Sequence, residues 1–376
     1  MDVINQLWKR CSMIRLLVAI ALLLVPSASA FAQEHIQILA TGGTIAGKSQ
    51  TSMGYMSGAL PIDTLIAAVP EIESYAKISW QQVANIGSQD MNISVWKSLY
   101  LAIEKAKKDQ TISAIVVTHG TDTLVDSAFL FDLLFPSGKP LIFVAAMRPA
   151  DHRSADGPQN LLDAIAVATS AQANHRGALI VMDSKILEAR NAYKKHTEAL
   201  GTFRPTNGGF AGELVNKEVV FYHPSARDSN AKSPFGLADI DRLSQVSVMA
   251  IYPGVSLLQY KDMVSKVPKA LVIAGVGNGN FPSTIHPLVE QFIESGGIVV
   301  RASQVPTGYV SRNIEIDDNQ LGTIAALGLS PQKARILLAL LLDKNMDNEQ
   351  IQHAFRCPIP STMQACSQAQ QLPDSP

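Results

Sequence analysis

Two short segments of this 376-residue chain place hydroxyl groups and glycines directly after an apolar run. The first is residues 41–47 (TGGTIAG), where paired glycines allow a tight turn that presents the hydroxyl of Thr44. Such a hydroxyl can act as a nucleophile when a neighbouring group accepts its proton. The same pattern also fits a plain strand–turn connection with a capping threonine. The spacing excludes the usual dinucleotide and phosphate loops.

The second segment is residues 118–123 (THGTDT), which follow the apolar run 114–117. Its hydroxyls and Asp122 could simply cap the helical pattern at residues 124–134, because Thr and Asp favour that position. Six polar or glycine residues directly after a buried strand exceed what a cap requires, and binding residues concentrate on such loops. We therefore interpret the segment as part of a functional site, and we assign no catalytic role to His119.

Short apolar runs alternate with helical patterns around these two segments. Strands are expected at residues 36–40, 114–117, 141–145 and 178–182, and helices at residues 94–108, 124–134 and 157–173. Strands that are apolar on both faces and separated by helices predict a mainly parallel sheet covered by helices. Ligands of such sheets bind beyond the carboxyl ends of the strands, which is where both segments fall.

A polar stretch, residues 223–248, interrupts the alternation and is interpreted as a linker. Apolar runs resume at residues 248–251, 270–274 and 298–300, and Ser330-Pro331 is a typical helix start. The predicted fold class is α/β, with a larger N-terminal domain over residues 33–222 that contains the sheet. A smaller α/β C-terminal domain is expected over residues 249–356, followed by a polar tail over residues 357–376.

The N-terminus has the three parts of a secretory signal. Basic residues precede the apolar run 16–25, and small residues follow it. The run is shorter than the ~20 residues that span a bilayer. Residues 1–32 are therefore predicted to be a signal peptide cleaved after Ala32, with Ala30 as the alternative, and the mature chain is expected to be periplasmic or secreted.

The composition narrows the classes of partner. The formal net charge is −1, from 31 basic and 32 acidic residues, so nothing electrostatic indicates nucleic acid or an anionic membrane surface. Three cysteines are too few for a disulfide-built scaffold. Cys357 and Cys366 could form a disulfide in an oxidising compartment or remain free thiols, and the sequence leaves both possibilities open. No Cys/His spacing indicates a metal site.

Taken together, residues 41–46 and 119–123 resemble the paired signatures of the bacterial-type asparaginases. The resemblance extends over nearly the whole mature chain and is closest to the exported type II branch. It implies hydrolysis of L-asparagine to L-aspartate and ammonia through an acyl-enzyme, without a metal or cofactor. The further segments that carry it are NIGSQDMN (85–92), AMRP (146–149), SADGP (154–158), AGVGNGN (274–280), VPTG (305–308) and SPQKAR (330–335).

For catalysis, the resemblance implies that Thr44 is the nucleophile and that Tyr55, in a mobile loop over residues 48–58, assists it. Glu315 of a neighbouring subunit supports this tyrosine. Thr121 and Lys194 form a pair that helps to activate the nucleophile or water, which requires a lysine that is neutral part of the time.

For substrate binding, Asp122 suits the α-ammonium of asparagine, whereas Ser88 and Gln89 suit its α-carboxylate. Asn278 is expected from the partner subunit, and backbone N–H groups near Thr121 and Ala146 are expected to hold the oxyanion. The implied assembly is a homotetramer built from intimate dimers, with a small-molecule substrate and no membrane contact after processing.

Two other functions remain open. A glutaminase-asparaginase of the same fold would act on both amides, because one methylene contributes only ~1–3 kcal/mol of discrimination. Gln89 favours the branch that prefers asparagine. A periplasmic amino-acid-binding protein would share the export signal and the two domains, but it would not need the Thr121–Lys194 pair.

Overall fold

The computed structural model describes residues 33–51, 54–266 and 269–357. The predicted signal peptide and residues 358–376 of the tail lie outside this range. Cys357 is disulfide-bonded. Cys366, for which the sequence left a disulfide with Cys357 and a free thiol both open, lies outside the described residues. None of the helices in the described ranges combines the length and apolar character that a membrane crossing requires.

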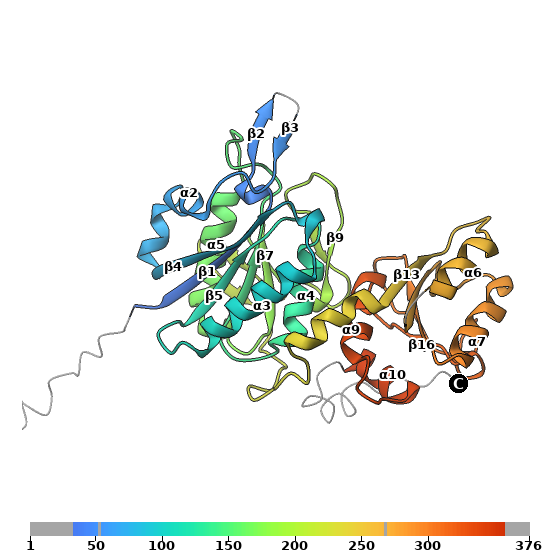
Figure 1. The fold of residues 1–376 in the computed structure, drawn as a ribbon. Coiled ribbons are helices and arrows are strands. Elements are labelled where there is room, and N and C mark those ends of the chain that lie inside the picture. Colours follow the sequence, from blue (N-terminus) through green and yellow to red (C-terminus); the bar gives the residue numbers. More distant parts are fainter. Residues whose placement is uncertain (1–32, 52–53, 267–268, 358–376) are drawn as a thin grey trace, which may run out of the picture. The chain divides into compact units, whose positions relative to one another are not determined.

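The larger sheet has eight strands in the order β12-β11-β8-β7-β6-β5-β1-β4 (Figure 1). The five neighbours from β7 to β4 run parallel, and β8, β11 and β12 add an antiparallel edge. The predicted mainly parallel sheet is confirmed, whereas the antiparallel edge was not predicted. The strands are β1 (His35–Gly42), β4 (Lys77–Ile86), β5 (Ala114–Thr118), β6 (Leu141–Val144), β7 (Ala178–Met182), β8 (Lys185–Glu188), β11 (Gly212–Val215) and β12 (Glu218–Phe221).

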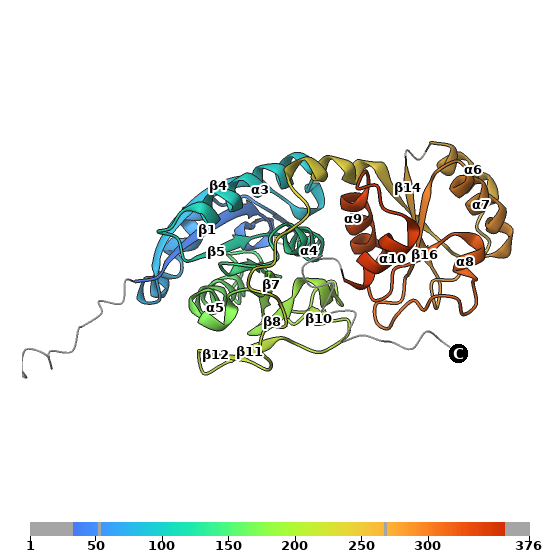
Figure 2. The same ribbon diagram turned by 90° about the horizontal axis from the view of Figure 1, so that it is seen from below.

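Helices cover both faces of this sheet (Figures 1 and 2). Successive side chains of a strand point to opposite faces. On β5, Ile115 and Val117 therefore pack into the core with α3 (Ile93–Lys108) and α4 (Leu124–Leu134). Ala114 and Val116 pack into the other core with α2 (Ile62–Ala67) and α5 (Gly157–Thr169). Two-sided burial explains why these strands are apolar throughout.

The smaller sheet is wholly parallel, in the order β13-β14-β15-β16. Its strands are β13 (Val246–Ala250), β14 (Ala270–Gly275), β15 (Ile298–Ser303) and β16 (Ile324–Ala325). One face packs against α9 (Pro331–Leu341), and the other packs against α6 (Leu257–Lys266) and α7 (His286–Glu294). α8 (Asp318–Leu321) precedes β16, and α10 (Asn348–Arg356) follows α9.

The stretch expected to be a linker contains ordered structure. Residues 237–245 form the 3-10 helix η6 (Leu237–Gln245), which packs against α3 and α9. Residues 246–248 already belong to β13. The remaining short elements are η1 (Thr44–Ala46), β2 (Lys48–Thr51), β3 (Gly54–Met56), η2 (Pro70–Ser74), η3 (Ser88–Asp90), η4 (Ala171–Ala173), η5 (Ala189–Asn191), β9 (Ala192–Lys194), β10 (Phe203–Pro205) and η7 (Ser283–Ile285).

Candidate functional site

The strand order brings the two hydroxyl-bearing segments to the same edge of the larger sheet. β1 lies between β4 and β5, and it pairs in parallel with both, with Ala40 opposite Thr118. The chain passes from β1 to β4 on one side and then crosses to β5 on the other, which makes this edge a topological switch point. Open α/β sheets bind their ligands in the crevice at such a point.

Two glycines allow these segments to touch. A Cβ atom on Gly43 would lie 2.3 Å from the Cα of Gly120, and one on Gly120 would lie 2.6 Å from Oγ of Ser88. Gly43 also has a φ of +84°, a backbone conformation that residues other than glycine rarely adopt. The glycines therefore permit the close backbone approach of the segments after β1, β4 and β5.

Thr44 lies at the start of η1, where it is 5% exposed, and its Oγ1 lies 3.1 Å from the hydroxyl of Tyr55. Tyr55 belongs to a β2–β3 hairpin that extends away from the sheet (Figure 1). The backbone N–H of Ser49 donates to both carboxylate oxygens of Asp151, at 3.1 and 2.9 Å, which ties the hairpin to the loop after β6. Together these contacts hold the exposed Tyr55 beside the nearly buried Thr44.

Lys194 contacts both polar side chains of the second segment. Its Nζ donates to Oγ1 of Thr121 at 3.0 Å and to Oδ1 of Asp122 at 2.6 Å. The lysine side chain is 20% exposed and the Asp122 side chain 60% exposed. The aspartate therefore faces an opening, while the lysine and threonine lie deeper beside it.

A second lysine, Lys333, is buried and anchors the segment that leads to Lys194. Lys333, on α9, donates to the carbonyl oxygens of Ala189, Arg190 and Ala192 at 2.7, 2.9 and 2.6 Å. Burial lowers the pKa of Lys333 to about 7, and the nearby Asp126 carboxylate partly opposes that shift. Lys333 was not predicted to have a role, because it lies between Gln332 and Arg335 in the polar first turns of α9.

Ser88 follows β4 and lies between the two segments. Its Oγ accepts from the backbone N–H of Asp122 at 3.1 Å, and its carbonyl accepts from Oγ1 of Thr123 at 2.8 Å. Because accepting leaves the hydroxyl proton of Ser88 available, this side chain can also donate to an anion. Gln89 is exposed, and its side chain lies against Gly87.

Ala146 is buried directly after β6. The loop beyond it is fixed by Asp156, whose carboxylate accepts from the backbone N–H groups of Met147 and Arg148 at 2.9 Å each. Asn160 donates to the carbonyl of Ala145 at 3.0 Å and to Asp156 at 3.0 Å. Neither Asp156 nor Asn160 was predicted to contribute to the site, although Asp156 lies within a segment that carries the family resemblance.

Asn278 and Glu315 lie elsewhere, on loops of the smaller domain. Oδ1 of Asn278 accepts from the backbone N–H of Ser311 at 2.8 Å, and Oε2 of Glu315 accepts from Nδ2 of Asn280 at 2.6 Å. Within the described residues, no hydrogen bond or ion pair joins either side chain to the Thr44 or Thr121 group. The chain therefore assembles one group of predicted site residues by itself and leaves two apart.

His119 is buried within the second segment. Its Nδ1 lies 2.7 Å from the carbonyl oxygen of Gly120, and its Nε2 has no hydrogen-bond partner in the part of the chain that the structure describes. Burial lowers the pKa of His119 to about 4. A neutral imidazole that donates from Nδ1 fits this position. Over the same described ranges, no cluster of three or more His, Cys, Asp or Glu side chains is arranged to hold a metal ion.

Comparison with known proteins gives the family. The sequence matches the family model described as "Asparaginase, N-terminal" over residues 35–227, and the one described as "Glutaminase/Asparaginase C-terminal domain" over residues 245–355. It is 40% identical to the probable periplasmic L-asparaginase of Haemophilus influenzae, over 88% of this chain and 95% of that protein. It is 39% identical to L-asparaginase 2 of Escherichia coli, over 89% and 96% of the two chains.

Solved structures agree with the sequence comparison. The probable cytoplasmic L-asparaginase of Campylobacter jejuni superposes with a TM-score of 0.80 at 36% identity, over 86% of this chain and 99% of that one. One family model matches the larger domain and the other the smaller, and the alignment with each of these relatives spans most of the chain. The chain therefore belongs to the asparaginase family.

Proposed function

We propose that this chain hydrolyses the side-chain amide of L-asparagine to L-aspartate and ammonia, with Thr44 as the nucleophile. The observation that carries the proposal is the meeting of two hydroxyl–partner pairs at one sheet edge. Thr44 contacts Tyr55, and Thr121 contacts Lys194. A hydroxyl needs a neighbouring group to accept its proton, and each pair supplies one.

The reaction would proceed in two balanced steps. In the first, Oγ1 of Thr44 bonds to the amide carbon, its proton reaches the leaving nitrogen through the neighbouring groups, and the C–N bond breaks to release ammonia. In the second, water attacks the ester, aspartate leaves, and Thr44 regains its proton. Backbone N–H groups near Thr121 and Ala146 would hold the oxyanion in both steps. The bonds from Asp156 and Asn160 would keep the loop at Ala146 in place.

Charge recognition would use Asp122, Ser88 and Gln89. The partly exposed carboxylate of Asp122 suits the α-ammonium of asparagine, and Ser88 with Gln89 suits the α-carboxylate. Asp122 already bonds to Lys194 at 2.6 Å. A bound ammonium would compete for that carboxylate, and the lysine would then interact more fully with Thr121. Substrate binding would thereby strengthen the contact between Lys194 and Thr121 that proton transfer requires.

The site would be completed by a second copy of the chain. In the described residues, the side-chain hydrogen bonds of Asn278 and Glu315 stay within the smaller domain, so we propose that they reach the Thr44 group of a partner across a two-fold interface, where every contact occurs twice. Glu315 would support Tyr55, and Asn278 would contact the substrate. A homotetramer built from two such intimate dimers is the assembly that we propose.

We also propose that the mature chain is periplasmic or secreted. The N-terminal sequence pattern supports export, and the Haemophilus influenzae relative is called periplasmic. The relative from Campylobacter jejuni is called cytoplasmic, so the fold alone carries no information about location. Sequencing the N-terminus of the exported chain would distinguish cleavage after Ala32 from cleavage after Ala30.

Glutamine is the second candidate substrate, which the description of the matching C-terminal family favours. A coupled assay of ammonia release with asparagine and with glutamine gives the ratio directly. Thr44→Ala should lose most turnover with both amides while its thermal unfolding stays nearly unchanged, because the hydroxyl acts in the transition state. Thr111→Ala is the matched control, since Thr111 is exposed and precedes β5 at the opposite end from Thr121. Ammonia release by Thr44→Ala at the native rate would refute the assigned nucleophile.

A further inference from the structure

An arginine lies inside an apolar strand of the smaller sheet. On β15, Val300 and Ala302 are buried on one face, and Val299 and Arg301 lie toward the other. The side chain of Arg301 is only 1% exposed. A charged guanidinium in such a place is strongly unfavourable unless it is paired and its donors are used.

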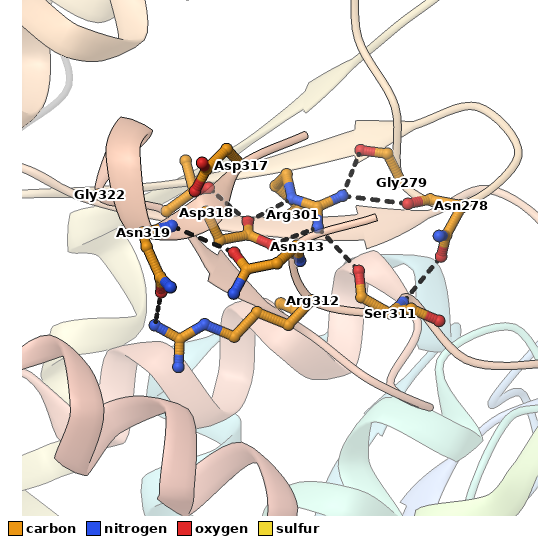
Figure 3. A network of polar contacts seen from close by, with 12 residues as sticks. Asn278, Gly279, Arg301, Ser311, Arg312, Asn313, Asp317, Asp318, Asn319 and Gly322 are labelled. Carbon is orange, nitrogen blue, oxygen red and sulfur yellow. Dashed lines mark hydrogen bonds and ion pairs between the residues drawn. The ribbon is translucent and has the colours of Figure 1, made fainter. Parts of the chain in front are cut away.

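All five N–H donors of Arg301 are used (Figure 3). Two of them form a bidentate ion pair with Asp318, whose side chain is fully buried. The other three donate to backbone carbonyls of two separate loops. The distances are 2.6 Å from Nε to Oδ1 of Asp318, 2.7 Å from Nη2 to its Oδ2, 3.0 Å from Nη2 to the oxygen of Ser311, and 3.0 and 3.4 Å from Nη1 to those of Asn278 and Gly279.

Asp318 is saturated as well. Besides both contacts with Arg301, it accepts from the backbone N–H of Asn313 at 3.0 Å and from Oγ1 of Thr323 at 2.5 Å. Four bonds occupy about all the acceptor sites of a carboxylate. The pair therefore fixes three pieces of backbone at once, namely the turn at Asn278, the loop at Ser311 and the start of α8.

These are the pieces that carry the two isolated site residues. The carbonyl of Asn278 bonds to Arg301, and its side chain bonds to the N–H of Ser311. Glu315 lies between Asn313 and Asp318, which are themselves joined. Because Ile316 is buried in the core of the smaller domain, its neighbour Glu315 is left on the exposed side.

We propose that Arg301, together with Asp318, is a positioning residue for the reaction. It sets the distance and orientation between the loops that present Asn278 and Glu315, and it never touches the substrate itself. The inference rests on the proposed function, in which these two side chains complete the site of a partner. A lysine cannot replace this arginine, since its three donors radiate from one nitrogen and cannot reach two carboxylate oxygens and three carbonyls.

The test begins with purified Arg301→Lys, assayed for ammonia release. We expect kcat to fall and KM to rise together, with kcat/KM reduced roughly tenfold or more, because small misplacements of contacting groups are costly. A merely structural role would reduce the amount of active enzyme, which lowers the apparent kcat and leaves KM unchanged. Unchanged KM would therefore overturn the proposal.

A second variant guards against simple misfolding. Replacing both partners, Arg301→Met with Asp318→Leu, removes two buried charges together, and such replacements often preserve stability. Here, however, we expect it to unfold below the native temperature, because three carbonyls and the N–H of Asn313 lose their partners. Folded protein assayed below that transition should show the same losses in kcat and KM. Arg227→Lys is the matched control, because Arg227 pairs with the buried Asp132 at 2.8 Å far along the chain from these loops. It should lower thermal stability and leave KM unchanged.

Co-assembly then separates this inference from the proposed function. Co-expression of Thr44→Ala with Glu315→Gln tests the shared site, since about a quarter of all sites should regain native composition in mixed dimers. Co-expression of Thr44→Ala with Arg301→Lys should recover the same fraction. Recovery with Glu315→Gln and none with Arg301→Lys would overturn the positioning role alone. No recovery with either would refute the shared site, and the positioning role with it.

Discussion

At the carboxyl edge of the larger sheet, Thr44, Thr121 and Lys194 meet their partners through side-chain hydrogen bonds. Beyond the smaller sheet, Asn278 bonds to Ser311 and Glu315 bonds to Asn280, each on the other's loop, and a buried ion pair holds both loops. The first region depends on glycines that let three segments touch, as at Gly43. The second depends on one saturated guanidinium.

The edge of the larger sheet and the loops of the smaller domain therefore suit two different tasks. In the proposed mechanism, the groups at the edge of the larger sheet exchange protons, and proton exchange requires direct contact between them. The smaller domain keeps Asn278 and Glu315 in a fixed geometry on two neighbouring loops, which suits groups that contact another molecule. Rigid support of this kind places a contacting group accurately before the partner arrives.

The largest expected effect tests the contact between Thr121 and Lys194. Thr121→Val and Lys194→Met should each reduce kcat at least ~100-fold, because each removes one member of a proton-transfer pair. The double variant should be little worse than either single one, since groups that act as a unit are not additive. Single-turnover and steady-state ammonia assays measure this. Lys195→Met is the control, because Lys195 is the exposed next residue. Multiplicative losses would show that the two side chains act separately.

An intermediate effect tests charge recognition by Asp122. A hydrogen bond to a charged group contributes about 1.5–3 kcal/mol, so Asp122→Asn should lower kcat/KM for asparagine roughly 10- to 100-fold. The comparison substrate is succinamate, which lacks the α-amino group and should be poor with the native enzyme. Its kcat/KM should change little in the variant. An equal loss with both compounds would mean that Asp122 acts through Lys194 rather than on the ammonium.

The smallest effect concerns stability at the larger edge. His119 has its pKa lowered to about 4 by burial, against an ordinary value of 6.5. Between these two values, the unfolded chain binds a proton that the folded chain does not. The free energy of unfolding should therefore fall as the pH drops from about 6.5 toward 4, by up to roughly 3 kcal/mol.

His119→Gln should lack this component of the acid destabilisation, as measured by denaturant unfolding at pH 7.5, 5.5 and 4. His223→Gln serves as the control, since His223 is exposed. If His119→Gln and the native chain lost stability in parallel, burial of a neutral histidine would not be what makes this edge sensitive to acid.

Much of the fold could be predicted because two-sided burial leaves a clear pattern. The apolar strands β5, β6 and β7 and the helix α4 lie where the runs indicated. The strand β4 was missed because it lies at the edge of the sheet and carries polar, exposed residues such as Gln81. β15 was predicted to end at Val300, because an arginine normally marks the surface, whereas the strand continues through Arg301 to Ser303.

The residues of the candidate site also differ in how well local sequence patterns indicate them. Thr121 was assigned to a site from the residues alone, since six polar or glycine residues directly after a buried strand exceed what a cap requires. The pattern at Thr44 also fitted a plain strand–turn connection, and the family resemblance favoured the nucleophile. Lys194 and Glu315 had only the family resemblance to distinguish them from solvated surface residues. Lys333 and Arg301 bond to backbone groups as far as 144 and 23 positions away in the sequence, and Asp156 bonds to N–H groups 8 and 9 positions before it. Such contacts leave no local pattern, because any polar residue that folds against a carbonyl or N–H group could make them.

The three carbonyls held by Lys333 have a consequence for the order of synthesis. Ala189, Arg190 and Ala192 are translated 141 to 144 residues before the lysine that binds them. A ribosome therefore completes both threonines and Lys194 long before the segment next to Lys194 can be anchored. The growing polypeptide can form the larger sheet early, yet the strand that carries Lys194 acquires its support only after α9 has left the exit tunnel. The segment next to Lys194 is therefore fully anchored only after most of the last third of the chain has been synthesised.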